Sequence, residues 1–588
     1  MVPQTKILGN NMKNILRLIA TVSSILTVFS CNKEIDKPID QPSEPETYTL
    51  SISASKMELT KGLELSGDAL IAIWDGTEEV YVFKNDAQVG VLTPDLSTLV
   101  YPEKVSCTLT GPFTTVPEAG DVLTLKLTSN NYSGQDGTLA FITGHCDYAV
   151  ATLHVTGVNN GQIESTEGTA AFENQQAIVK FTLKDKADDT TLLTPTTLTV
   201  NDGTSDIATA TIPAATYTTN GSGVLYVAIP PVAGKTLTLT ATVGAYDYVY
   251  TKDAATFVQG QYYTISVKMQ RKVNISSISG DFEAQNGDIL TGDFYHDDTY
   301  SFSIAYDATV TLHNAVIENK RRAGLEPKGN CVIILEGNNY IFGGTFYPGL
   351  SAPGHTLTIK GNGMLKVTGG NEAPGIGGGN IRIEDGNITA TGGIYAAGIG
   401  GGYYGGCGDI TIKGGNVTAI GSDYAAGIGG GYYGGCGNIT ISGGNVTATG
   451  GVNSEGIGVN AAGIGGGFYG GCGDITISGG NVTATGVEGA AGIGSGKDSN
   501  CGDIIIEDLV TRVTAIKGIN APNCIGPGLN GSCGDIAFGD IYNYVYTYGT
   551  GAEREWIYNI EDGFEWGGLH LTMSTTIREN DTWTLTQL

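Results

Sequence analysis

A repeat marked by cysteines in the C-terminal half constrains this chain more than any other feature. Cysteine stands at positions 407, 436, 472, 501 and 533, so successive steps are 29, 36, 29 and 32 residues, and the longest step holds an insertion around Val452 to Asn460. A repeat of this length that cannot bury its own apolar face stacks on its neighbours as a solenoid. Each unit holds three short segments of alternating apolar residues between glycine-rich corners, which predicts one coil of a parallel β-helix.

Residues one repeat apart are expected to lie directly above one another. Neighbouring parallel strands are about 4.8 Å apart, so equal residues form columns. The sequence predicts two isoleucine ladders and one asparagine ladder at a corner: Ile399, Ile428, Ile464 and Ile493; Ile410, Ile439, Ile475 and Ile504; and Asn387, Asn416, Asn445 and Asn481. Over roughly 356–540 the pattern resembles the AGIGGG and GNITISGG repeats of bacterial cell-surface proteins with β-helix domains.

The rest of the chain also alternates apolar and polar residues. Short strand-like segments broken by Gly, Pro, Asp and Asn run from Tyr48 to about Lys272, which is typical of β-sandwiches. After Ile541 the repeat stops and aromatic residues become frequent, as expected of a cap over the last coil. The predicted fold is all-β, and its parts are two β-sandwiches at 47–165 and 166–272, a parallel β-helix at 273–540 and a C-terminal cap at 541–588.

Three motifs in the sandwich region carry a resemblance to a known family. Phe257–Val267 (FVQGQYYTISV) resembles the closing strand of fimbrillin-like surface proteins, Gly67–Ile73 (GDALIAI) is similar to their early turn and strand, and Val227–Pro231 (VAIPP) to their strand before a proline turn. The resemblance covers about residues 48–271. It implies a two-domain transthyretin-like sandwich that builds or caps surface fimbriae, with other fimbrial subunits as partners.

The N-terminal segment resembles a bacterial lipoprotein signal. It holds Lys13 and Arg17, then the apolar stretch LIATVSSILTVF and soon after it Cys31. A stretch this short is typical of a signal peptide rather than a membrane span. We expect a signal peptide at 1–30, lipidation of Cys31 and a polar tether at 31–46, with the protein at the cell surface as an outer-membrane lipoprotein or in a fimbria. The alternative is an ordinary secretory signal with an incidental cysteine.

Six aromatic residues in the glycine-rich loops of the repeat are the candidate ligand-binding residues. They come in pairs at equivalent positions: Tyr403 and Tyr404, Tyr432 and Tyr433, and Phe468 and Tyr469. Aromatic faces on a flat solenoid wall can bind sugar rings, and a phenol can add a hydrogen bond. The alternative is that at least one ring of each pair packs on its counterpart in the next coil and only seals the loop.

The cysteines suggest core packing rather than metal binding. No CxxC pairs occur and no histidine recurs with the repeat, which disfavours zinc and iron–sulfur sites. The repeat cysteines are expected to be thiols facing the core, because parallel strands in register hold two side chains poorly for a disulfide, although an oxidising compartment permits one. Cys107 and Cys146 in the first sandwich are the better candidates for a disulfide.

A column of acidic residues follows the repeat cysteines. Its members are Asp409, Asp474, Asp503 and Asp535, with Asn438 in one copy. Stacked carboxylates can share calcium, but the Gly-Gly-x-Gly-x-Asp nonapeptide of calcium solenoids is absent, and an Asx turn that starts each strand is the simpler interpretation. We therefore expect no cofactor and no metal.

The predicted function is adhesion at the cell surface. A net charge of −28 without a basic stripe excludes a nucleic-acid partner. We expect a fimbrial tip or accessory subunit that contacts a host or bacterial glycan or protein, and no enzyme, because no nucleophile elbow, P-loop or Rossmann fingerprint occurs. The alternatives are a surface carbohydrate-binding or polysaccharide-degrading protein and a purely structural stalk.

Overall fold

The computed structural model describes most of the chain from Tyr48 onward. The described residues are 48–56, 64–66, 69–71, 74, 76–99, 106–127, 131–146, 148–297, 300–452, 459–507, 509–539, 542–548, 552–556 and 582–587. The predicted signal peptide, the lipidation site Cys31 and the tether lie outside them. Within these ranges no helix is long and apolar enough to cross a membrane.

The first β-sandwich is a mainly antiparallel sheet that closes on itself, in which β1 pairs in parallel with β10 and β9. The sheet order is β10-β1-β6-β5-β4-β7-β8-β9, and β10 also pairs with β8. Its core holds Leu109, Phe113 and Phe172, which the alternating strands turn inward, together with Trp74 from the segment before β4. Its strands are β1 (Tyr48–Lys56), β4 (Val80–Lys84), β5 (Ala87–Asp95), β6 (Ser106–Phe113), β7 (Val122–Leu127), β8 (Ala149–Asn159), β9 (Gln162–Ser165) and β10 (Ala170–Asn174), with a separate hairpin of β2 (Glu64–Ser66) and β3 (Ala69–Ile71) and the short helix η1 (Leu96–Thr98).

The second β-sandwich follows directly and is built around Phe181, Leu198, Val227 and Met269. In it β11 lies between β14 and β17, and β12, β13, β15 and β16 complete the sheet. Its elements are β11 (Ala177–Asp185), β12 (Thr197–Asn201), β13 (Asp206–Thr211), α2 (Ala214–Asn220), β14 (Val224–Ile229), β15 (Val232–Val243), β16 (Tyr246–Phe257) and β17 (Tyr262–Asn274).

One segment of the predicted first sandwich packs on the second. The helices α1 (Leu139–Phe141) and η2 (Ile142–Cys146) bury Ile142 and Cys146 against Ile178 and Tyr226. The buried amide of Gln135 ties the segment down, since Nε2 donates to the carbonyl of Ala228 at 2.9 Å and Oε1 accepts from its N–H at 2.8 Å. The segment between β7 and β8 of the first sandwich therefore packs on the second.

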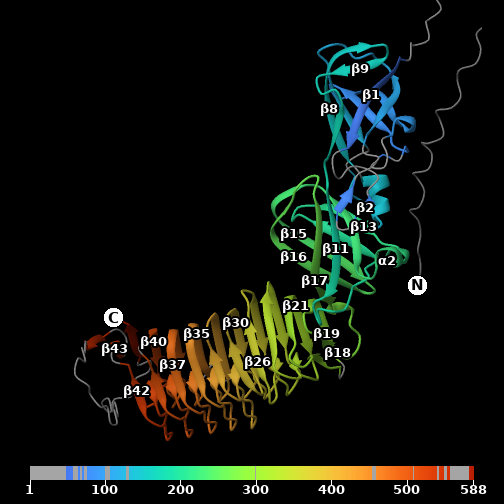
Figure 1. The fold of residues 1–588 in the computed structure, drawn as a ribbon. Helices are drawn as coiled ribbons and strands as arrows, with labels where there is room; N and C mark the ends of the chain where they lie inside the picture. The colour runs from blue at the N-terminus through green and yellow to red at the C-terminus, as the bar shows by residue number, and fades with distance from the viewer. Residues whose placement is uncertain are drawn as a thin grey trace, which may run out of the picture.

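A parallel β-helix begins where β17 ends. β17 pairs in parallel with β19, so the sheet of the second sandwich runs into the first coils without a break. Figure 1 shows the two sandwiches stacked above one end of the β-helix, which extends away from them at an angle.

The β-helix has three faces. The first holds β19 (Ile289–His296), β21 (Thr309–Asn319), β23 (Cys331–Glu336), β26 (Thr356–Lys360), β29 (Asn380–Ile383), β32 (Ile410–Ile412), β35 (Ile439–Val452), β37 (Ile475–Thr485), β39 (Ile504–Ile506) and β42 (Ile536–Phe538). The second holds β24 (Asn338–Phe342), β27 (Met364–Thr368), β30 (Asn387–Thr391), β33 (Asn416–Ser422) and β40 (Val510–Ile516), together with the later halves of β21, β35 and β37.

The third face consists of very short strands. It starts with β18 (Phe282–Ala284), β20 (Phe302–Ile304) and β22 (Glu326–Pro327), whereas the short helix η3 (Ile275–Ser277) lies beside the second half of β19, where the Asp293 N–H donates to the Ser276 Oγ at 2.8 Å. It continues with β25 (Leu350–Ser351), β28 (Ile376–Gly377), β31 (Ile399–Gly400), β34 (Ile428–Gly429), β36 (Ile464–Gly465), β38 (Ile493–Gly494) and β41 (Ile525–Gly526). Glycine occupies the second position of most of these pairs because the coils approach closely there, and an added Cβ at Gly429 would lie 1.9 Å from the carbonyl oxygen of Gly465.

The register confirms the predicted columns. In both isoleucine ladders each residue pairs with its copy in the next coil, and all eight side chains are fully buried. The ladders are Ile399, Ile428, Ile464 and Ile493, and Ile410, Ile439, Ile475 and Ile504. In the asparagine ladder Asn416 pairs with Asn445, whose Nδ2 donates to the Asn416 Oδ1 at 3.0 Å. The all-β fold with two sandwiches and a parallel β-helix is confirmed.

The strands after the last coil run antiparallel. β43 (Tyr542–Tyr548) pairs with β44 (Ala552–Trp556) and β45 (Thr582–Gln587), and β45 pairs with β40. This pairing covers the edge of β40, where a further coil would otherwise add.

The close approach of the third face gives a stability prediction. Gly429→Ala combines a backbone conformation that side chains rarely adopt, with φ at 132°, and a collision with the next coil. The conformation alone costs about 1–3 kcal/mol. We expect a lower unfolding temperature for the β-helix in calorimetry. Gly406→Ala is the matched control, since an added Cβ there meets nothing closer than 3.6 Å, and equal losses from both variants would contradict the argument.

Candidate ligand-binding surface

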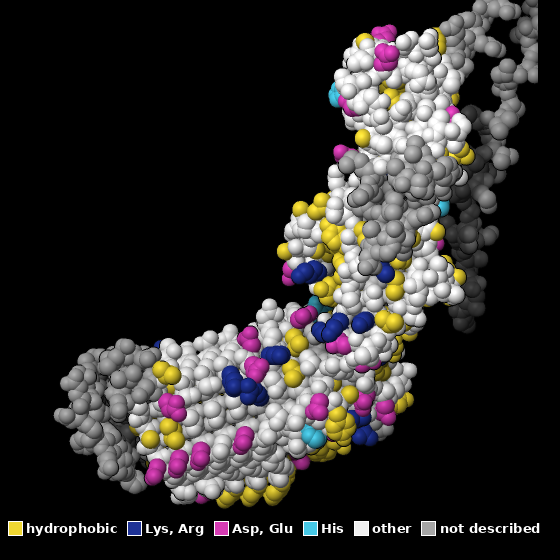
Figure 2. Space-filling model, viewed as in Figure 1, with side chains coloured by type: hydrophobic (Ala, Val, Ile, Leu, Met, Phe, Trp, Pro, Cys, Tyr) yellow, Lys and Arg dark blue, Asp and Glu magenta, His cyan; other side chains and the backbone are white. Residues whose placement is uncertain are grey.

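Eight aromatic rings gather along one edge of the β-helix, in the loops on either side of its third face. We call this cluster the aromatic edge: Tyr395, Tyr403, Tyr404, Tyr424, Tyr432, Tyr433, Phe468 and Tyr469. It contains all six residues that the sequence singled out. Figure 2 shows hydrophobic side chains along the lower edge of the β-helix and a row of acidic side chains above them.

The outer column of the aromatic edge is exposed. Tyr404, Tyr433 and Tyr469 stack with ring centroids 4.9 Å apart at both steps and with planes inclined by 5° and 10°. Their exposed fractions are 66%, 41% and 47%. Each ring packs on its counterpart in the next coil, as the second interpretation expected, and still faces solvent.

The middle column is half-buried and supports the outer one. Tyr403, Tyr432 and Phe468 stack at 5.5 Å and 5.7 Å. The Tyr403 hydroxyl is hydrogen-bonded to that of Tyr404, and this bond is the main cause of its raised pKa. Burial first, and then the hydrogen bond with Tyr433, raise the pKa of Tyr432 to about 12. The phenols therefore stay neutral at physiological pH and keep their protons for hydrogen bonding.

The outer tyrosines adopt left-handed backbone. Their φ angles are 54° for Tyr404, 58° for Tyr433 and 55° for Tyr469, in a region that bulky residues rarely enter. In the next two coils the same position holds Asp498 and Asn530, whose short polar side chains suit this conformation. The fold of this corner therefore requires only a residue that tolerates left-handed backbone, such as Asp or Asn.

The corner does not require tyrosine. A left-handed bulky residue costs about 1–3 kcal/mol, and the outer column carries that cost three times. Each ring contact contributes about 0.5–1.5 kcal/mol, and the outer rings make two contacts along the column and three, at 4.1–4.4 Å, with the middle rings of their own coils, so contacts and strain are of similar size. Asp498 and Asn530 hold the same corner in the next two coils without such rings, and strain of this kind clusters at functional sites.

Sequence reasoning missed the third column, Tyr395 and Tyr424. Their φ angles are 69° and 65°, and their ring centroids lie 5.3 Å from Tyr403 and 5.1 Å from Tyr432 respectively. The available signal was a tyrosine directly before the Ala-Ala-Gly-Ile-Gly string in both coils, 29 residues apart. These two tyrosines lie in the loop before the short third-face strand of each coil, whereas the other rings lie in the loop after it.

The acidic column forms a hydrogen-bond ladder. The Asp409 Oδ1 accepts from the backbone N–H of Asn438 at 2.8 Å, the Asn438 Oδ1 accepts from the N–H of Asp474 at 2.9 Å, and the pattern repeats through Asp503 and Asp535. Each oxygen thus binds the coil above rather than its own turn. Among the described residues no group of three or more His, Cys, Asp or Glu is placed to hold a metal ion.

Two expectations about the cysteines are wrong. Cys107 and Cys146 do not form a disulfide, because Cys107 lies in the core of the first sandwich whereas Cys146 lies in the cluster against the second. Cys501 and Cys533 of neighbouring coils do form one, with their Cα atoms 4.6 Å apart. Neighbouring parallel strands bring two Cα atoms within the range that a disulfide spans.

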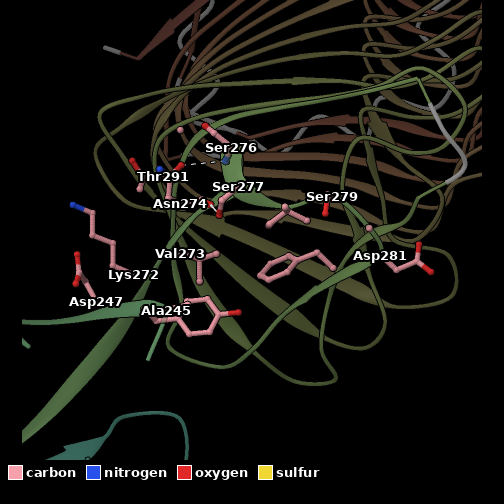
Figure 3. A pocket seen from close by; sticks show the side chains of 15 residues that line it. Ala245, Asp247, Lys272, Val273, Asn274, Ser276, Ser277, Ser279, Asp281 and Thr291 are labelled. Atoms are coloured by element: carbon pink, nitrogen blue, oxygen red, sulfur yellow. Dashed lines mark hydrogen bonds between the residues drawn. The ribbon is translucent and has the colours of Figure 1, made fainter. Parts of the chain in front are cut away.

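A groove of about 860 Å³ lies between the second sandwich and the first coil. The groove is lined by Ser276, Ser277 and Ser279 together with Tyr246 and Phe282. In Figure 3 Asp247 and Lys272 lie at one end and Asp281 at the other. The Asp281 carboxylate accepts bonds from the Ser301 N–H and hydroxyl, and the backbone bond is the main cause of its lowered pKa. A lowered pKa makes Asp281 a poor general acid.

An ion pair fixes the wall of this groove. The guanidinium of Arg271 in β17 donates to both carboxylate oxygens of Asp288 at 2.8 Å and 2.6 Å, and it also lies over the Tyr246 ring. The Asp288 side chain is only 2% exposed, and burial raises the pKa of Asp288 despite its partner. The pair joins the second sandwich to the first coil.

Comparison with protein families supports the repeat. Residues 381–403, 410–432, 439–468 and 475–497 match a family model described as beta helix repeat. The first begins in β29 and the others at the first residues of β32, β35 and β37, so each starts on the first face of a coil. No curated protein matches the chain.

Several solved structures are similar over the N-terminal part. They include a fimbrial assembly protein from Parabacteroides distasonis (14% identity, 38% of this chain, 95% of that chain, TM-score 0.23), the shaft pilin SpaA from Lactobacillus rhamnosus GG (12%, 38%, 98%, 0.18) and the TIE protein of Bacillus anthracis (14%, 40%, 37%, 0.13).

The ion pair gives a second prediction. Arg271→Ala leaves a buried carboxylate without its partner, and such losses cost about 3–5 kcal/mol. Burial raises the pKa of Asp288 and Arg271 lowers it, so the loss of Arg271 should raise the folded-state pKa further, and the loss of unfolding free energy should shrink as pH falls and Asp288 is protonated, and grow as pH rises. Chemical denaturation from pH 4 to 8 measures the difference in unfolding free energy between the variant and the unaltered chain. The exposed neighbour Lys272→Ala is the control, and a deficit that does not change with pH would contradict this account.

Proposed function

We propose that this chain is a surface adhesin, a fimbrial tip or accessory subunit, whose β-helix binds a glycan along the aromatic edge. The observation that supports the proposal is the outer column of Tyr404, Tyr433 and Tyr469, which is exposed and left-handed at a corner that Asp498 and Asn530 also fill. Partly exposed rings beside hydroxyl groups bind the apolar and polar sides of a sugar together.

The spacing of the rings favours an extended chain of sugars. Ring planes in contact need only about 3.5–4.0 Å between them, so near-parallel rings with centroids 4.9 Å apart are offset and each leaves part of its face uncovered. This spacing is close to the length of one sugar unit in an extended β-linked polysaccharide. The proposed ligand therefore lies along the axis of the β-helix with one sugar on each coil.

The remaining parts fit an appendage on the cell surface. The sandwiches would attach the chain to other fimbrial subunits, and lipid on Cys31 would hold it to the outer membrane. The rigid junction through β17 and β19 and the Arg271–Asp288 pair would project the aromatic edge away from that attachment. The formal charge of −28 keeps such a surface soluble and disfavours polyanionic partners.

A polysaccharide-degrading enzyme is the second candidate, and the junction groove favours it. The groove holds the carboxylates Asp247 and Asp281. A glycosidase needs two carboxylates facing one bond, one of them a general acid with a raised pKa. Asp281 has a lowered pKa and lies at the opposite end of the groove from Asp247, so we rank this candidate below adhesion and propose that the chain is not an enzyme.

The test replaces the outer column without disturbing its corner. The triple variant Tyr404→Asn, Tyr433→Asn, Tyr469→Asn keeps left-handed residues, as Asn530 shows, and should fold normally by circular dichroism. We expect at least a tenfold weaker affinity for β-linked oligosaccharides on an array, since tenfold is about 1.4 kcal/mol and three rings are lost. Affinity of the unaltered chain should rise with oligosaccharide length up to about three sugars.

The control is Tyr306→Asn, which removes an exposed tyrosine that lies outside the aromatic edge. Equal binding by the triple variant and the unaltered chain would overturn the proposal and leave a structural stalk. Loss of attachment to cells without any glycan binding would instead indicate a protein ligand. Release of shorter sugars would favour the enzyme.

A further inference from the structure

The five repeat cysteines form one column with a constant backbone register. The N–H of Cys407 donates to the carbonyl of Gly435 at 3.0 Å, and the N–H groups of Cys436, Cys472 and Cys501 donate to Gly471, Asn500 and Ser532 at 3.0, 3.1 and 2.9 Å. Each acceptor directly precedes the next cysteine in the column. All four steps therefore hold their cysteines in the same relative position.

One of these steps is already a disulfide. Cys501 and Cys533 are bonded with their Cα atoms 4.6 Å apart, inside the span of about 4.4–6.8 Å that disulfides use. Because the other steps share the register, their sulfur atoms are also within reach of one another. A column of five can hold at most two bonds between neighbours, so one cysteine remains a thiol.

The side-chain contacts select the second pair. The Cys407 Sγ donates to the carbonyl of Gly379 in the preceding coil at 3.1 Å, so this thiol is directed away from Cys436. The thiol of Cys436 is hydrogen-bonded to that of Cys472. Both residues are partly exposed while their side chains pack against the core, and the hydrogen bond with Cys472, followed by burial, raises the pKa of Cys436.

We propose that Cys436 and Cys472 are a second oxidation site, which forms an inter-coil disulfide in an oxidising compartment. The oxidant is an external disulfide. One cysteine thiolate attacks it and releases one external thiol, and the other cysteine then displaces the second external thiol from the mixed disulfide. The Cys436–Cys472 bond forms, the external bond breaks, two electrons pass to the external disulfide, and the two S–H protons end on the released thiols.

The proposed bond would strengthen the coils that carry the aromatic edge. Coils of a solenoid contact only their neighbours, so a pull applied at one coil is resisted by a single interface. The bond between Cys436 and Cys472 would join the coil of Tyr433 to that of Tyr469. This oxidation site goes beyond glycan binding and holds whether or not a glycan is the ligand.

The experiment maps disulfides in the full chain. The purified protein is incubated natively with oxidised glutathione, quenched with acid, alkylated with N-ethylmaleimide in denaturant and digested without reduction. Trypsin leaves Cys436 and Cys472 on one peptide, because no Lys or Arg lies between Lys413 and Lys497, and a glutamate-specific protease then separates them at Glu455. We expect a linked pair of peptides with Cys436 and Cys472, and N-ethylmaleimide on Cys407.

Two variants complete the test. Cys472→Ser should leave Cys436 alkylated, and Cys407→Ser should leave the new bond intact. Alkylation of both Cys436 and Cys472 in a chain that retains the Cys501–Cys533 bond would overturn the proposal. A bond from Cys407 to Cys436, or from Cys472 to Cys501, would overturn it equally, because either shows that the side-chain contacts do not select the pair.

Discussion

The parallel hydrogen-bond ladder between coils is the interaction on which the rest of this structure depends. It fixes neighbouring strands at about 4.8 Å, so a residue in one coil lies above its counterpart in the next. Inside, this stacks Ile410 on Ile439 in a buried column. At the corner it places the Asp409 carboxylate against the backbone of Asn438. Each column is therefore a consequence of one spacing and not a separate feature.

The same spacing sets the geometry of the candidate binding surface. Aromatic rings in contact would stack more closely than the coils allow, so the rings of Tyr404 and Tyr433 are offset and remain partly uncovered. A surface that repeats with the period of the coils suits a ligand that also repeats. The parallel pairing of β17 with β19 continues the same ladder from the second sandwich into the first coil.

Sequence reasoning predicted the columns well and the single contacts poorly. A column depends on a repeat length, which is printed in the chain, and so Ile399, Asn416 and their copies were placed correctly. The pairing of Cys107 with Cys146 was wrong because the segment of Cys146 folds against the next sandwich. Tyr395 was missed because the short third-face strand brings its loop to the edge that holds Tyr403.

By itself, the sequence determined the all-β class, the coil length and the residues that share a column, because alternation and repeat length are local properties that the hydrogen-bond ladder converts directly into structure. Only the tertiary structure decided which columns meet at one edge, which backbone is left-handed, and which of the repeat cysteines are bonded. These depend on the path of each corner and on atoms far apart in the chain, and no repeat length specifies them.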